Sequence, residues 1–146
     1  EFGLAVAGVR HVDAESISKY CSLKAEQVRE NVYHCTDMIE KPTRDQVFTD
    51  LAILGRVVLT PEIFNILDKT PPGAKGEIQL TDAMAVLART KGMKACVFEG
   101  ERFDVGNKLS YIESNVYMGL RHPETKEGFK EYILKIAKEL ENDTSR

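Results

Sequence analysis

Residues 51–67 read LAILGRVVLTPEIFNIL, and this stretch is the clearest indication of the fold class. Its first nine residues are apolar apart from one glycine and one arginine, which is typical of a buried, central β-strand. Thr60 and Pro61 come next and favour a helix start, because threonine supplies a capping oxygen and proline suits the first helical position. The helical face that follows is apolar: Ile63, Phe64 and Leu67. A strand that leads directly into a helix indicates an α/β protein.

The rest of the chain extends this pattern in both directions. Four further strands are predicted, the middle two joined by a polar turn: residues 4–12, 20–28, 31–40 and 93–99. Three more helices are predicted: residues 82–91, a segment that Asn107 caps, and a C-terminal stripe from Phe129 to Leu140. We expect an α/β fold with a helical C-terminal extension. The C-terminal stripe fits packing into the chain's own core better than an oligomer contact, although both interpretations stay open.

Composition excludes several classes of protein. The chain has 146 residues with 42% hydrophobic and 29% charged residues, which is typical of a globular domain or of half of a larger one. Its net charge of −3 gives no overall attraction to nucleic acid or to an anionic membrane. The sequence contains no run of 18 or more apolar residues, so no membrane-spanning helix is predicted. The chain begins Glu1-Phe2-Gly3 without methionine, which suggests a cut, a tag remnant or an excised domain.

The cysteines are three in number and form no CxxC pair: Cys21, Cys35 and Cys96. An odd number without motif spacing favours a reducing, cytoplasmic setting over a disulfide framework. A zinc site is not expected, because the three histidines lack ligand spacing to these cysteines.

Two short segments are candidates for chemistry. Glu40-Lys41-Pro42 ends a predicted strand, where a carboxylate can accept hydrogen bonds from sugar hydroxyls and a lysine can neutralise a phosphate. Asp104 precedes a predicted helix, where a carboxylate can bind Mg²⁺ and the helix N-terminus favours phosphate. Taken singly, each segment is better explained as structural: solvated charges at a strand end, and an Asp-x-Gly turn.

A third segment, residues 77–82, reads EIQLTD. Thr81 or Asp82 suits a helix cap, which is the natural structural interpretation. Glu77 and Gln79 are candidates for reaching a neighbouring site. The loop before it, KTPPGAKG at 69–76, lacks P-loop spacing and is expected to shape a rim.

In order along the chain, these segments resemble bacterial UTP–glucose-1-phosphate uridylyltransferases. The resemblance covers nearly the whole chain and is carried by the following strings: VDAESISKY at 12–20, EKP at 40–42, LAILGR at 51–56, LTPEIF at 59–64, KTPPG at 69–73, GEIQLTDA at 76–83, FDVGNKLSY at 103–111 and YMGLRH at 117–122. It implies part of a Rossmann-like mixed-sheet nucleotidyltransferase fold. Residues 1–106 would be the sugar-phosphate-binding part and residues 107–146 the helical extension, an oligomer contact. The glycine-rich nucleotide-binding half lies outside these residues.

The resemblance also implies roles for single residues. Glu40 would bind glucose hydroxyls, Lys41 the sugar phosphate, and Asp104 a catalytic Mg²⁺, with Lys41 and Asp104 as the catalytic pair. Cys21 and Gly55 would lie at the sugar. The implied partners are UTP, glucose-1-phosphate, UDP-glucose and further copies of the chain, with no nucleic acid and no membrane. The whole protein would be an enzyme, and this part alone is expected to be inactive.

The chain departs from the family pattern around the sugar pocket. Cys21 stands where the family has a glycine that approaches the sugar, Thr49-Asp50 replaces Ser-Asn, and Val57 replaces a tyrosine. These changes leave open a regulatory paralogue that binds UDP-glucose with little or no catalysis. A plain α/β interaction domain and an enzyme for thymidine or another nucleotide are further alternatives. Without the other half, the strands at 4–12 and 51–59 are expected to expose free edges.

Overall fold

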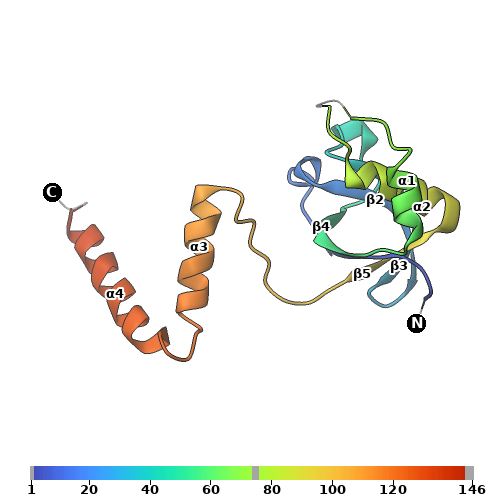
Figure 1. Ribbon diagram of the computed structural model, residues 1–146. Helices are drawn as coiled ribbons and strands as arrows, with labels where there is room; N and C mark the ends of the chain where they lie inside the picture. Colours follow the sequence, from blue (N-terminus) through green and yellow to red (C-terminus); the bar gives the residue numbers. More distant parts are fainter. Residues whose placement is uncertain (1, 74–75, 144–146) are drawn as a thin grey trace. The chain divides into compact units, whose positions relative to one another are not determined.

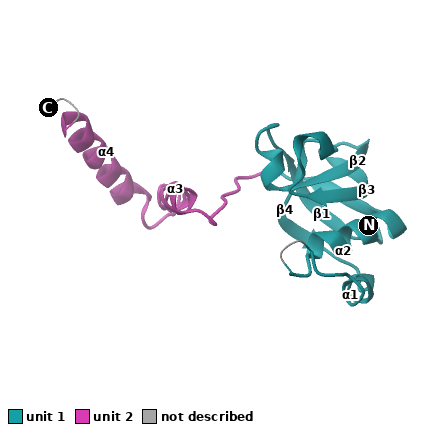
Figure 2. Ribbon diagram, turned by 90° about the horizontal axis from the view of Figure 1, so that it is seen from above, with its two compact units in different colours: residues 1–99 teal, residues 100–146 magenta. Residues whose placement is uncertain are grey.

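The computed structural model describes residues 2–73 and 76–143, and it divides the chain into two compact units, Glu1–Glu99 and Gly100–Arg146 (Figure 2). Within the described residues, the first unit holds the strands β1 (Val6–His11), β2 (Cys21–Arg29), β3 (Val32–Glu40), β4 (Leu51–Val58) and β5 (Met93–Val97) (Figure 1). Its α-helices are α1 (Glu62–Leu67) and α2 (Leu80–Lys91). Two short 3₁₀ turns, η1 (Ile17–Lys19) and η2 (Arg44–Gln46), lie between strands.

The five strands form one mixed sheet in the order β1-β4-β2-β3-β5. β1 and β5 are parallel, and every other pair is antiparallel. A mixed sheet with helices confirms the predicted α/β class. The expectation of a free edge is wrong for β1, which pairs with both β4 and β5. For β4 it holds in part, because the described pairing with β2 covers only Ala52 and Ile53 of that strand.

The hairpin of β2 and β3 follows from its turn. Glu30 and Asn31 separate the two strands, and Asn31 takes a left-handed φ of 57°. Asparagine tolerates this conformation, which a tight two-residue hairpin requires. The predicted hairpin is confirmed.

The core of the first unit lies between α2 and the sheet, where α2 packs on β3. Its largest fully buried side chains come from both layers: Val9, Leu23, Leu51, Met84, Leu87 and Met93. Gly92 ends α2 with a φ of 76°, as predicted, and a Cβ at this position would lie 2.6 Å from Cε1 of the His34 ring. Glycine is therefore required twice here, for backbone conformation and for space.

Two predicted helix caps are wrong. The N-cap of α1 is Pro61 rather than Thr60, and the Thr60 hydroxyl instead lowers the pKa of the exposed Glu62 carboxyl by hydrogen bonding. α2 begins at Leu80 with Gln79 as its N-cap, so neither Thr81 nor Asp82 caps it. The helix starts earlier because the Gln79 backbone is extended while its carbonyl already accepts a hydrogen bond from Ala83.

The second unit holds α3 (Lys108–Gly119) and α4 (Lys126–Asp143). Asn107 caps α3, as predicted: its side-chain oxygen accepts a hydrogen bond of 2.9 Å from the Ser110 amide. No described residue of α4 is buried, so the second unit by itself does not cover the helix's apolar stripe. None of the helices in the described part of the chain has the length and apolar character needed to cross a bilayer.

Candidate functional site

The start of β2 and the end of β3 bring two predicted site residues together. Cys21 is paired with Glu40 in the antiparallel register of these strands. One residue further on, the Lys41 amide donates a hydrogen bond of 2.9 Å to the Tyr20 carbonyl. Pro42 is fully buried and fixes the chain beyond the strand. The glutamate, the lysine and the cysteine therefore belong to one small structural corner.

Lys41 has a strained backbone. Its φ of 47° is left-handed, and apart from the hairpin residue Asn31 no other non-glycine residue of the described ranges shows a positive φ. A side chain in this region costs about 1–3 kcal/mol, and such outliers gather where a structure holds a group for function. The Lys41 side chain is exposed while its backbone is held by Tyr20 and Pro42. Its ammonium group is thus presented to solvent from a fixed point.

Cys21 is not placed as a reactive thiol. Its side chain is buried, and burial is the main cause that raises the pKa of the thiol to about 12, with the negative charge of Glu40 as a smaller cause. A thiol with this pKa stays protonated at neutral pH, and the thiolate is the nucleophilic form. Cys21 therefore acts through its volume, next to Glu40, rather than through its chemistry.

An open groove of about 710 Å³ lies beside this corner, and Glu40 is one of its lining residues. The floor and walls come from the end of β3, from α1 and α2, and from Phe48 and Pro71. Polar groups on the groove are Asp37, Asn65, Lys69, Thr70, Asp82 and Arg89. The groove combines hydrogen-bonding groups with apolar surface, as sites for small polar ligands do.

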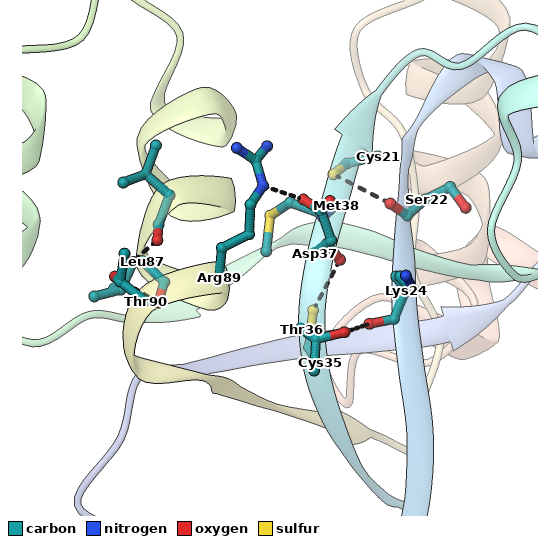
Figure 3. A network of polar contacts seen from close by, with 11 residues as sticks. Cys21, Ser22, Lys24, Cys35, Thr36, Asp37, Met38, Leu87, Arg89 and Thr90 are labelled. Atoms are coloured by element: carbon teal, nitrogen blue, oxygen red, sulfur yellow. Dashed lines mark hydrogen bonds and ion pairs between the residues drawn. The ribbon is translucent and has the colours of Figure 1, made fainter.

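An ion pair that joins α2 to β3 forms part of one wall of the groove. Nε of Arg89, on α2, lies 2.8 Å from Oδ1 of Asp37, on β3, and the same oxygen accepts a hydrogen bond from the Met38 amide (Figure 3). Sequence reasoning missed this pair, because neither residue belongs to a motif and 52 positions separate them.

Ser22, the residue after Cys21, is hydrogen-bonded to Thr49, one of the departures from the family pattern. Ser22 is buried, and its hydroxyl donates a hydrogen bond of 2.9 Å to the Thr49 carbonyl and accepts from the amides of Phe48 and Thr49. The Thr49 hydroxyl in turn donates a 2.7 Å bond to the Leu23 carbonyl. The loop before β4 is thereby fastened to β2 directly behind Cys21.

Gly55 does not share the groove with Glu40. It has a φ of 75° at the bulge where the register of β1 and β4 shifts, and it lines a separate hollow with Gly8, Arg56 and Phe98. The positive φ gives a structural reason for glycine at this place. Contact of Gly55 with a sugar stays a prediction.

Glu77 and Gln79 contact the preceding loop. The Gly73 amide donates a 2.9 Å hydrogen bond to the Glu77 carbonyl, and a Cβ on Gly73 would lie 3.4 Å from Gln79 Cγ. Ala74 and Lys75 lie outside the described residues. These contacts agree with the expected role of this loop in shaping a rim.

Asp104 belongs to the second unit. Its Oδ1 accepts a hydrogen bond of 3.1 Å from the Gly106 amide, and its Oδ2 lies 3.9 Å from Nη2 of Arg102. The side chain is 49% exposed, so the carboxylate keeps free lone pairs. Mg²⁺ commonly binds one or two carboxylates together with water and substrate phosphates, so one exposed aspartate fits as part of such a site. No group of three or more metal-binding side chains occurs among the described residues.

The chain is similar to enzymes that act on sugar phosphates. It is 40% identical over 139 residues to a UTP–glucose-1-phosphate uridylyltransferase of Streptococcus pyogenes, covering 94% of this chain and 45% of the relative. A solved UDP-glucose pyrophosphorylase complexed with UDP-glucose matches 79% of this chain and 44% of its own, with a TM-score of 0.74 at 41% identity.

A second solved structure, the UTP-bound enzyme from Acinetobacter baumannii, matches 90% of this chain and 45% of its own, with a TM-score of 0.78 at 32% identity. No protein-family model matches the chain. The resemblance predicted from the motifs is therefore confirmed, and so is the nucleotidyltransferase fold class. The chain spans about 45% of the length of the curated relative described above.

Proposed function

We propose that this chain is the sugar-phosphate-binding part of a nucleotidyltransferase that makes UDP-glucose and pyrophosphate from UTP and glucose-1-phosphate. The similarity to the streptococcal enzyme supports the reaction, and the corner around Lys41 supports the site. Since the chain spans about 45% of that relative, further residues would supply the nucleotide-binding half. The chain alone would then bind sugar phosphate weakly and would not catalyse the uridylyl transfer.

The observation that carries the proposal is the strained, outward-facing Lys41 directly after Glu40. Glu40 lines the groove and its carboxylate can accept hydrogen bonds from two sugar hydroxyls. Lys41 can place a compact positive charge on the phosphate of the same sugar. A backbone held in a costly conformation beside a hydrogen-bonding acid is a poor arrangement for stability alone, and a useful one for positioning a ligand.

The reaction needs little covalent help from the protein. An oxygen of glucose-1-phosphate attacks the α-phosphorus of UTP in line, a new P–O bond forms, and the bond to the β-phosphate breaks to release pyrophosphate. Positioning and charge neutralisation supply most of the rate in such transfers. Lys41 would hold the attacking phosphate, Glu40 would orient the glucose ring, and Asp104 would bind a divalent cation. That cation, which we propose to be Mg²⁺, supplies neutralising charge to the phosphates.

Three further features belong to the proposal. Three free cysteines among the described residues favour a reducing, cytoplasmic compartment. The exposed apolar side chains of α3 and α4 favour an assembly of several copies. The boundary between the sugar-phosphate part and the helical extension is proposed after Gly106.

An alternative function is a regulatory paralogue that binds UDP-glucose with little or no catalysis. Cys21 favours it, because the buried thiol lies opposite Glu40 where the resemblance implies a glycine that approaches the sugar. Replacing this side chain by hydrogen in Cys21→Gly would then restore space at the pocket. A rise of pyrophosphate release in Cys21→Gly, from a very low level in the unchanged protein, would support the alternative.

Pyrophosphate release from UTP and glucose-1-phosphate with Mg²⁺ tests the proposal, measured on this chain and on the natural full-length product. The proposal predicts release by the full-length product and none by the chain alone. No release by either, with UDP-glucose still bound, would favour the regulatory paralogue. No release and no binding of UDP-glucose would leave a plain interaction domain.

A further inference from the structure

A stack of three side chains lies beside the Asp104 loop within the second unit. The ring of Phe103, the residue directly before Asp104, lies 4.8 Å from the ring of Tyr117 on α3 with an interplanar angle of 56°. The guanidinium carbon of Arg121 lies 3.4 Å from the centroid of the same Tyr117 ring. Tyr117 is therefore in contact with an aromatic ring and with a cation, and both contacts are attractive.

The stack determines where the loop can lie. On one side of Asp104, Phe103 is held on Tyr117; on the other side, Asn107 is held to α3 as its cap. Only three residues, Asp104 to Gly106, span these two attachments. A short segment fixed at both ends on one helix has few conformations, so its carboxylate keeps a defined position without a buried contact of its own.

Among the described residues, Arg121 has no acidic partner, and its guanidinium group stacks on the Tyr117 ring instead. Its Nη1 also donates a long hydrogen bond of 3.4 Å to the Tyr117 carbonyl. Because arginine stacks its planar guanidinium on aromatic faces, it restricts the ring that Phe103 leans on. Arg121 lies in the turn after α3, and its described side-chain contacts are both with Tyr117, so any effect on Asp104 passes through Tyr117 and Phe103.

We infer that Tyr117 is a positioning residue for Asp104. The Tyr117 ring holds Phe103, and Arg121 restricts the Tyr117 ring, so that the Asp104 carboxylate is presented in one place to a divalent cation. The inference rests on the proposed function, in which Asp104 binds that cation. Outer contacts that orient a ligating side chain typically change metal affinity by about 10–100-fold when they are removed. The expected signature is weaker metal binding with unchanged binding of the sugar nucleotide.

The test measures Mn²⁺ affinity of the full-length protein by electron paramagnetic resonance titration in the presence of UDP-glucose. Tyr117→Ala is expected to raise the Mn²⁺ dissociation constant about 10-fold, and Tyr117→Phe, which keeps the ring, to stay within about two-fold of the unchanged protein. Tyr111→Ala is the matched control: Tyr111 lies on the same helix with its side chain 56% exposed, and Mn²⁺ affinity should not change. UDP-glucose affinity without metal is measured for every variant.

Asp104→Asn separates the inference from the proposed function. If Asp104→Asn weakens Mn²⁺ binding and Tyr117→Ala does not, the inference is wrong and the metal role of Asp104 stands. If Asp104→Asn binds Mn²⁺ as the unchanged protein does, the metal role is wrong and the inference falls with it. Equal losses of metal and UDP-glucose affinity in Tyr117→Ala would show a merely structural role. Phe103→Leu, a milder change to the same contact, replaces Tyr117→Ala if that variant does not fold.

Discussion

The two units of this chain use their apolar residues in opposite ways. In the first unit, apolar side chains of α2 and the strands are sealed between helix and sheet, as Leu87 and Met93 show with exposures of 1% and 0%. In the second unit, α3 and α4 keep large apolar side chains in solvent, such as Ile112 at 59% and Leu140 at 63%. The first unit therefore has a core of its own, whereas the two helices of the second unit do not cover their apolar side chains by themselves.

The largest expected effect of this difference is on core truncation. Leu87→Ala in the first unit should lower the free energy of unfolding by about 2–5 kcal/mol, because it removes buried surface and leaves a cavity. Leu134→Ala on α4, whose side chain is 53% exposed, should change it by less than about 0.5 kcal/mol. Urea denaturation of the chain followed by circular dichroism checks both. Similar losses in the two variants would erase the distinction between the units.

A second difference is the response of the first unit to alkaline pH. Burial raises the pKa of the Cys21 thiol from 9.0 to about 12 and that of Cys35 to about 11. The folded state therefore binds these protons more tightly than the unfolded state. Their contribution to stability is complete below pH 9 and is lost as pH rises through the folded pKa values.

The expected slope above pH 9 is a loss of up to about 1.4 kcal/mol per pH unit for each thiol. Cys21→Ala removes one of the two groups and should flatten the slope accordingly, which unfolding curves between pH 8 and pH 10.5 would measure. Native-state alkylation gives a second reading: Cys21 and Cys35 should resist iodoacetamide until urea is added. A slope identical to that of the unchanged chain would show that the Cys21 thiol is not protected by the fold.

A third prediction concerns the cap of α3 in the second unit. Asn107→Ala removes the hydrogen bond to the Ser110 amide and should cost about 1 kcal/mol, felt locally at the start of α3. Hydrogen exchange of residues 108–112 should quicken, while the exchange of α2 stays the same. If α2 also exchanged faster, the two units would be coupled in stability.

The smallest expected effect is a gain in stability at the proposed site. Lys41→Gly relieves the left-handed strain, whereas Lys41→Ala keeps it, so the glycine variant should be more stable than the alanine variant by about 1 kcal/mol. Thermal unfolding of the two variants measures the difference. Equal stability would show that the backbone at Lys41 stores no strain, and the site would lose its main structural support.

Much of the first unit follows from local patterns in the sequence. The strand at 51–58, the hairpin around Asn31 and the glycine that ends α2 were each predicted from propensity and turn chemistry. The order of the strands in the sheet was not predictable, because the pairing of β3 with β5 joins residues about 60 positions apart. The caps of α1 and α2 were predicted from side-chain oxygens, whereas both helices begin without a side-chain cap hydrogen bond, so the predicted start was off by one to three residues.

The candidate site divides in the same way. Glu40, Lys41 and Asp104 were found as members of motifs, and Cys21 as a departure from one. The Arg89–Asp37 pair and the bonds between Ser22 and Thr49 were missed, because they join positions that are far apart in the sequence. What covers the stripe on α4 was left open between core packing and an oligomer contact, since helical periodicity shows that a face is apolar without showing what covers it.

In the proposed uridylyl transfer, Lys41 neutralises the phosphate of the sugar. The most direct test of this role is the rate of pyrophosphate release by the full-length product carrying Lys41→Ala, with Lys24→Ala, an exposed lysine on β2, as the control. We expect Lys41→Ala to lower the rate of pyrophosphate release at least about 100-fold, the scale for losing one preorganised charge contact. Lys24→Ala should leave that rate unchanged. Near-normal turnover in Lys41→Ala would contradict this role.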